Sequence, residues 1–158
     1  MPIIKSHQTG FAQATILLLA ILGGGAVLAH EHAEGIVAER MQAMKDMASH
    51  IKALGEMLDG RVAYEDAVAL DHALALRKNC HEVAGQFPAG AHDHHSRAAP
   101  AVWNQPEKFS AQMDNLERVV SELVAATVSG RRESIRARFV DVGSACKSCH
   151  EAFRLPEN

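Results

Sequence analysis

The stretch from Ile135 to Phe153 reads IRARFVDVGSACKSCHEAF. Its apolar and sulfur-bearing side chains recur at steps of three and four residues, which places them on one face of an α-helix. The residues on this face are Ile135, Phe139, Val142, Cys146, Cys149 and Phe153. The pattern predicts an amphipathic helix whose two cysteines lie on the side that faces the protein core.

Three further stripes with the same period lie upstream of this helix. They predict helices over residues 34–58, from about 65 to 85, and over about 104–130. Their apolar positions are Val37, Met41, Met44, Ala48, Ile51, Leu54 and Leu58 in the first; Ala69, Ala73, Leu76, Cys80 and Val83 in the second; and Phe109, Met113, Leu116, Val120, Leu123 and Thr127 in the third.

Glycine, proline and asparagine residues mark where these helices begin and end. Gly60 is expected to end the first helix in a left-handed cap, and Gly85 to close the second. Asn104 is a candidate N-cap for the third helix, with Pro106 in its first turn. That helix is expected to end at Gly130.

The connection at residues 86–104 is long, and its prolines, glycine and histidines interrupt the helical period. The other two connections are short, which favours antiparallel neighbours. An aromatic content of 4% and many Ala, Leu and Met residues argue against a β-sheet protein. We therefore expect an all-α fold, an antiparallel four-helix bundle.

The N-terminal residues 1–29 have a different composition from the rest of the chain. Lys5 is their single charged residue, and an apolar run at residues 14–22 is followed by small residues, as in a cleavable signal peptide. Cleavage there would leave one domain, residues 30–158, with 15 of the 16 Lys and Arg residues against all 19 Asp and Glu, a formal charge of −4. We expect a periplasmic protein with no general affinity for nucleic acid.

The sequence from Cys146 to His150 is C-x-x-C-H, the signature at which a c-type haem is attached. Two thiols one helical turn apart can bond the two vinyl groups of a porphyrin, and the adjacent histidine can ligate its iron. A zinc site is an alternative, but it would need Cys80 or His81 to complete four ligands. A redox dithiol is another, although it normally occurs in a βαβ setting. Haem attachment is the interpretation that the export signal supports.

Residues 142–154 resemble the last helix of the cytochrome c′ family, and the order of four helices with a long second connection is similar as well. Further agreement with the family lies in Arg40, Met44, Phe87-Pro88, Trp103 and Phe109. The resemblance covers essentially the whole of residues 30–158. It implies a four-helix bundle that holds one covalently attached haem c inside.

The resemblance also implies roles for individual residues. Cys146 and Cys149 would be the thioether anchors and His150 the proximal iron ligand. Arg154 matches a basic residue near the proximal imidazole, and Arg40 matches an arginine that pairs with a haem propionate. A guanidinium suits that pairing because it can bind a carboxylate through two parallel hydrogen bonds.

Met44 matches the distal position that faces the iron. The family includes low-spin members, in which such a methionine is the sixth ligand, and high-spin members with five ligands. The string Ala43-Met44-Lys45-Asp46 resembles the low-spin members, whereas Arg40 and residues 47–50 resemble the high-spin ones. A methionine at helical spacing is also often only core packing. Our expectation is that Met44 binds the iron.

Iron ligation by Met44 would make the protein a carrier of single electrons between periplasmic redox partners. An open sixth position would instead make it a protein that binds NO or CO. Nothing in the sequence near the motif supplies an acid, a base or a nucleophile, so we do not expect an enzyme. Family members often form homodimers, but the sequence shows no clear apolar patch for one.

A histidine-rich loop and the cysteine outside the motif have no role in haem binding by this interpretation. The loop residues His92, His94 and His95 around Asp93 offer donors for zinc, copper or nickel, or they form an ordinary solvated loop. Cys80 lacks a second cysteine at the spacing that haem attachment needs. It is expected to be a buried thiol, with a bond between two chains as the alternative.

Overall fold

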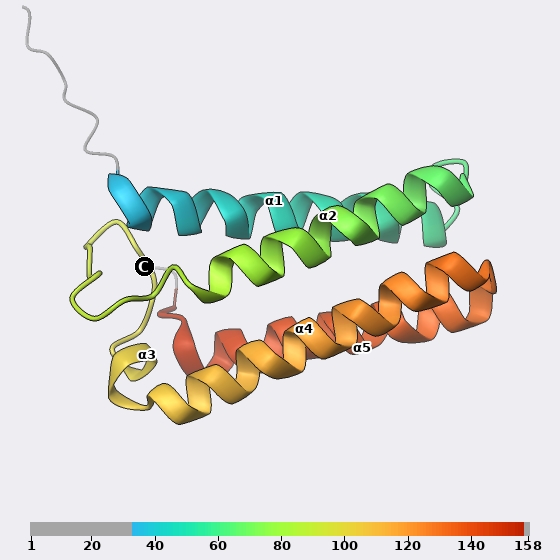
Figure 1. Cartoon of the computed structure of the whole chain (residues 1–158). Helices are drawn as coiled ribbons and strands as arrows, with labels where there is room; N and C mark the ends of the chain where they lie inside the picture. The colour runs from blue at the N-terminus through green and yellow to red at the C-terminus, as the bar shows by residue number, and fades with distance from the viewer. Residues whose placement is uncertain (1–32, 157–158) are drawn as a thin grey trace, which may run out of the picture. The chain divides into compact units, whose positions relative to one another are not determined.

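The structure is a computed structural model and describes residues 33–156 (Figure 1). Its long helices are α1 (Gly35–Leu58), α2 (Asp66–Ala84), α4 (Pro106–Ser129) and α5 (Arg132–Phe153), and α3 (Ala101–Asn104) is a single turn. The predicted all-α four-helix bundle is confirmed. The signal peptide expected at residues 1–29 lies outside the described residues. None of the helices within residues 33–156 is both long enough and apolar enough to cross a membrane.

The connection between α2 and α4 contains a helical turn that the sequence pattern did not predict. Asn104 was expected to cap α4, but it is the last residue of α3, and Gln105 occupies the capping position without a side-chain bond. Pro106 does begin α4, as expected. The short helix forms because Val102, at its centre, is buried against the core. The prediction for Asn104 is therefore wrong.

Three glycines end helices as predicted, although not in the same way. Gly60 and Gly130 have φ angles of 74° and 69°, in the left-handed region that favours glycine. Gly85 ends α2 with a φ of −81°, which is an ordinary helical value. Only the first two positions thus require glycine for their backbone conformation.

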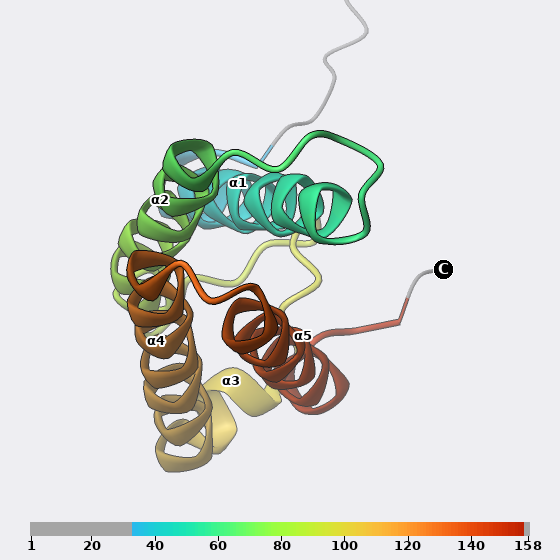
Figure 2. The same cartoon turned by 90° about the vertical axis from the view of Figure 1, so that its right-hand side faces the viewer.

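The four long helices surround a single core. The closely packed pairs are α1 with α2, α2 with α4, and α4 with α5. Figure 2 looks along the bundle and shows α2 and α4 on one side, with α1 and α5 on the other. The predicted stripes supply most of the core, and its fully covered side chains include Leu54, Leu76, Leu123, Ile135 and Val142. The α1 stripe is wrong at Ala48, which is exposed, whereas Met47 is buried.

α1 and α5 approach each other at one end of the bundle, which we call the turn end. Gly55 lies so close to α5 that a Cβ atom there would be 3.2 Å from the Phe139 ring. Arg136 donates a hydrogen bond to the carbonyl of Leu58. Arg132 lies 3.4 Å over the ring of Tyr64, in the connection between α1 and α2. The turn end is formed by Gly55, Leu58, Tyr64, Arg132, Arg136 and Phe139.

Candidate functional site

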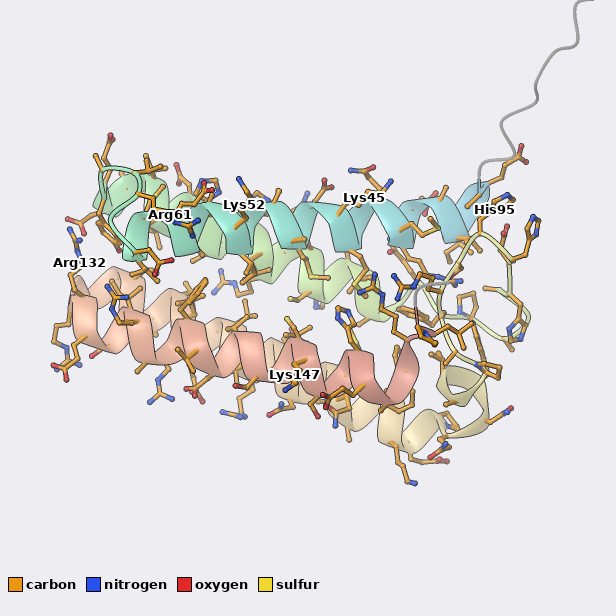
Figure 3. All side chains as sticks on the ribbon, turned by 180° about the vertical axis from the view of Figure 1, so that it is seen from behind. Lys45, Lys52, Arg61, His95, Arg132 and Lys147 are labelled. Carbon is orange, nitrogen blue, oxygen red and sulfur yellow. The ribbon has the colours of Figure 1, made fainter. Side chains whose placement is uncertain are left out.

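At the opposite end of the bundle, α1 and α5 are the two walls of a cavity of about 360 Å³. We call this the cavity end, and in Figure 3 it is marked by His95, with Arg61 and Arg132 at the far end of the molecule. The volume lies in the range of cofactor sites. Phe109 of α4 and Val102 of α3 contribute apolar surface between the walls.

The α5 wall carries the residues of the C-x-x-C-H motif. Cys149, His150 and Arg154 line the cavity, and Phe153 lies beside them. Cys146 is half-buried and packs against the same core. The spacing explains this arrangement, since residues three and four apart on a helix share one face. The prediction that both cysteines lie on the core side is confirmed.

Burial controls the protonation of this wall. It raises the pKa of the thiols of Cys146 and Cys149, which keeps both protonated near neutral pH. It also lowers the pKa of His150, as do the nearby cations of Arg154 and Arg97. The imidazole is therefore neutral, which is the form that ligates a metal ion.

The α1 wall presents Met41, Met44, Lys45 and Ala48 to the cavity. Met44 thus faces the same space as His150, from the opposite wall. Met47, by contrast, is buried in the core, where the thiol of Cys80 lies 3.4 Å from its sulfur. Of the methionines on α1, the structure therefore brings Met41 and Met44 to the cavity.

Arg40 is only 2% exposed, although it carries a charge. Its guanidinium donates hydrogen bonds to the carbonyl oxygen of Gln86 at 3.3 Å and to Oγ of Ser96 at 3.0 Å. It also lies 5.0 Å from the ring centre of Phe87 and 5.7 Å from that of Trp103. Burial lowers its pKa, and the carboxylate of Asp93 opposes this shift. The side chain joins α1 to the loop that covers the cavity.

That covering loop, residues 86–100, is fastened to the end of α5. The amide of Ala99 donates to the carbonyl of Phe153 at 2.9 Å, and the amide of Leu155 donates to the carbonyl of Arg97 at 2.8 Å. The Arg97 guanidinium also donates to the carbonyl of Leu155, at 2.7 and 3.0 Å. On the other side, the Trp103 indole donates to the carbonyl of Pro88 at 2.9 Å. The loop is thereby held over the cavity.

Sequence reasoning did not identify Ser96, Arg97 or Val102 as parts of the site. Each lines the cavity, and Ser96 holds Arg40 in place. No sequence signal marks Ser96 or Arg97, because they lie in an aperiodic segment with no motif. Val102 was detectable only as an apolar residue between Pro100 and the third predicted helix.

The structure also tests two other interpretations of the cysteines: Cys80 as a buried thiol, and the motif cysteines as part of a zinc site. Cys80 is 2% exposed, and burial raises its pKa to about 12, so the interpretation as a buried thiol is confirmed. His81 is on the surface, where it lies 3.3 Å from Glu117. Within residues 33–156, the motif cysteines do not form a three-residue metal group with another His, Cys, Asp or Glu. The four-ligand zinc site is therefore not assembled.

The residues of the cavity fit the haem that the motif implies. A porphyrin is a flat apolar ring with two vinyl groups and two carboxylates. The cavity offers apolar walls, the thiol of Cys149 with Cys146 one turn away, and a neutral His150. It also offers guanidinium groups for the carboxylates, from Arg40, Arg97 and Arg154.

Comparison with known proteins gives a consistent result. A family model described as cytochrome c′ matches residues 35–154. The cytochrome c′ of Rhodopseudomonas palustris is 29% identical over 147 residues, which cover 92% of this chain and 97% of that protein.

Solved structures agree in fold. The crystal structure of cytochrome c′ from Rubrivivax gelatinosus has a TM-score of 0.72 at 28% identity, over 75% of this chain and 94% of that one. A nitric oxide complex of a variant of the Alcaligenes xylosoxidans protein has a TM-score of 0.73 at 27% identity, over 77% and 94%.

Proposed function

Because this chain belongs to the cytochrome c′ family, whose members carry a covalently attached haem c, we propose that it is an exported, periplasmic cytochrome that carries single electrons. In this proposal Cys146 and Cys149 anchor one haem and His150 is the proximal iron ligand. Bound there, the haem supplies a one-electron iron couple and an iron whose sixth position takes a protein side chain or a small gas. The chain acts as a carrier for redox partners and not as an enzyme.

The observation that carries the proposal is the placement of Met44 and His150 on opposite walls of one cavity. A thioether facing an imidazole is the ligand pair of electron-carrying c-type cytochromes, in which it raises the reduction potential. Met44 lies nine residues after Gly35, in the third turn of α1. Its neighbour Met47 is buried in the core, where it contacts Cys80. Met44 is accordingly the side chain we assign to the sixth position.

We expect the two walls to orient a haem in the cavity. The motif cysteines lie on α5, whereas Arg97 belongs to the covering loop and Arg40 is hydrogen-bonded to it. The carboxylates of a haem would therefore be directed to the loop, where Arg40 is buried among Phe87, Trp103 and Ser96. Arg154, four residues after His150, shares the motif's wall; burial first, and then Arg154 and Arg97, lower the pKa of the proximal imidazole.

Gas binding is the second candidate function. It is favoured by the apolar surface that Ala48 and Met41 give to the α1 wall, which would surround an open sixth position. It is also favoured by the likeness to the nitric oxide complex described above. In that case Met44 would be a packing residue, and the protein would capture NO or CO.

The test is the visible spectrum of the purified haem protein, ferric and ferrous, with and without CO. We expect a methionine-to-iron charge-transfer band and no response to CO. Met44→Ala should lose the band and acquire CO binding. The matched control is Met41→Ala, which removes a thioether from the same wall and should behave as the unmodified protein. A CO response in the unmodified protein would replace electron transfer by gas binding.

A further inference from the structure

Three donor side chains meet in the covering loop, outside the haem cavity. The donor atoms of Asp93, His94 and His95 all lie within 4.8 Å of one another. Oδ1 of Asp93 is 2.7 Å from Nδ1 of His95 and 3.7 Å from Nδ1 of His94. Ligands around a tetrahedral zinc ion, with bonds of about 2.0 to 2.1 Å, are roughly 3.3 Å apart. Small side-chain rotations would therefore bring the three donors to one ion.

The backbone of this segment is held in place before any ion arrives. The amide of Ser96 donates to the carbonyl of Asp93 at 3.0 Å, and the amide of His95 donates to Oδ1 of Asp93 at 2.7 Å. Ser96 is in turn bonded to Arg40 through its hydroxyl. The side chains of Asp93 and His95 are each only 23% exposed. These contacts reduce the entropy that a mobile loop would lose on binding an ion.

An open hollow of about 460 Å³ adjoins Asp93 and His94, whereas His95 lines the haem cavity on the other side. His92, Asp93, His94 and Trp103 are among the residues that line it, and the ring of His92 lies 3.9 Å from that of Trp103. Water and ions can therefore reach the cluster from solvent. The hollow leaves room for a water molecule as a further ligand, as in zinc sites with three protein ligands.

The charge of the cluster suits a cation. Hydrogen bonding by the backbone amide of His95 holds the pKa of Asp93 below its usual value, so this side chain is a carboxylate near neutral pH. An ion would take the place of the hydrogen between Asp93 and Nδ1 of His95, and His95 would then bind it as the tautomer that carries its proton on Nε2. The Arg40 guanidinium acts against binding, although its hydrogen bonds are directed to Gln86 and Ser96.

We propose that Asp93, His94 and His95 form a binding site for a divalent transition-metal ion such as Zn²⁺ or Cu²⁺. Two imidazoles and one carboxylate are ligands of this class of ions, whereas Mg²⁺ and Ca²⁺ prefer oxygen donors. The site does not depend on the proposed electron transfer. It does lie next to the haem cavity, because His95 lines that cavity.

Zinc binding to the haem-loaded protein tests the proposal, with the bound ion measured by equilibrium dialysis. We expect one ion per chain that the double variant Asp93→Asn/His94→Ala binds at least about tenfold more weakly. Asn at position 93 can still accept the amide hydrogen bond of His95, so the loop should keep its conformation. The matched control is His81→Ala, which removes an exposed histidine on α2 and should leave the affinity unchanged.

Cu²⁺ provides a second readout, since electron paramagnetic resonance detects nitrogen ligands directly. Two imidazole nitrogens in the unmodified protein, and one in the His94→Ala variant, are the expected result. Histidines at positions 30 and 32 are present in all full-length variants and so do not affect the difference between them. Equal Zn²⁺ affinity in the double variant, or no Zn²⁺ binding at all by the unmodified protein, would overturn the proposal.

Discussion

The two ends of the seam between α1 and α5 differ although they are built from the same pair of helices. At the turn end, a glycine admits the Phe139 ring, and Arg136 bonds to the backbone of α1. At the cavity end, a cavity of about 360 Å³ separates the two helices, and the covering loop is bonded to both of them. One end thus provides contact between the helices, and the other provides a binding site. Mutations at the turn end should therefore mainly change the free energy of unfolding, and mutations at the cavity end should mainly change the surroundings of the haem.

The largest expected effect comes from the turn-end half of the core. Ile135 is completely buried in the first turns of α5, so Ile135→Ala should lower the free energy of unfolding by about 2 to 5 kcal/mol. Denaturant unfolding of the haem protein measures this, with the visible spectrum of the folded state as the control. A changed visible spectrum in the folded variant would contradict the idea that the turn end affects stability without affecting the haem surroundings.

Arg40→Ala should have a smaller effect on stability and a larger one on the cavity. The variant leaves the Gln86 carbonyl and the Ser96 hydroxyl without their donor, at a cost of about 1 to 3 kcal/mol. Since both acceptors are in the covering loop, amide exchange there should accelerate and the visible spectrum should shift. Arg40→Lys keeps the charge and should retain more of the spectrum. An unchanged exchange rate in Arg40→Ala would show that Arg40 does not hold the loop.

Gly55→Ala examines the close approach at the turn end. Crowding against Phe139 destabilises this variant, while the better helix propensity of alanine offsets about 1 kcal/mol of the cost. With a crowding cost of about 1 to 3 kcal/mol, the net loss in the free energy of unfolding should be about 0 to 2 kcal/mol. In a Phe139→Leu background, Gly55→Ala should instead raise the free energy of unfolding, because the ring that crowds the new Cβ atom is absent. Equal effects of Gly55→Ala in both backgrounds would mean that this contact does not matter.

The smallest expected effect concerns a histidine pair away from both ends. Nδ1 of His50 on α1 lies 3.0 Å from Nδ1 of His72 on α2. Burial and His72 lower the pKa of His50, and Asp46 opposes them. The folded state then binds fewer protons than the unfolded one, so this contribution to stability is lost as the pH falls below the unfolded pKa of about 6.5.

The measurement for this pair is the stability of the haem protein from pH 5 to pH 8, compared with that of His50→Gln. The variant should lose less stability on acidification than the unmodified protein. An identical slope in the two proteins would exclude His50 as the titrating group.

The sequence predicted the helices well because burial on a helix is periodic. Ile135, Val142 and Phe153 are buried at the positions that the stripe indicates. The same periodicity placed Cys146 and Cys149 on the core side of α5, the C-x-x-C-H motif identified His150, and the resemblance to the family identified Arg40 and Met44. The residues predicted for the haem site therefore come from two long helices that carry a periodic stripe or a motif, α1 and α5, and from the end of α5.

The covering loop was not predictable in the same way. Ser96 and Arg97 contact Arg40 and Leu155, which are 56 and 58 residues away in the sequence. Such contacts depend on how the helices are arranged, and no local pattern records them. The α3 turn was missed for a related reason, since it forms where Val102 meets a core made by other helices. Nor does the sequence pattern show that α1 and α5 are in contact at the turn end and separated by a cavity at the other end.

The long sequence separations of the loop's contacts also imply an order of assembly. The α1–α2 and α4–α5 hairpins have short connections and can close quickly, whereas the bonds from Arg40 to Gln86 and from Arg97 to Leu155 join residues 46 and 58 positions apart. We therefore expect the loop to close last in folding, after both walls of the cavity exist. Until then the cavity would admit a rigid, flat molecule from the loop side. Pulsed hydrogen exchange would show this order as late protection of the amides of Ala99 and Leu155, and early protection there would contradict it.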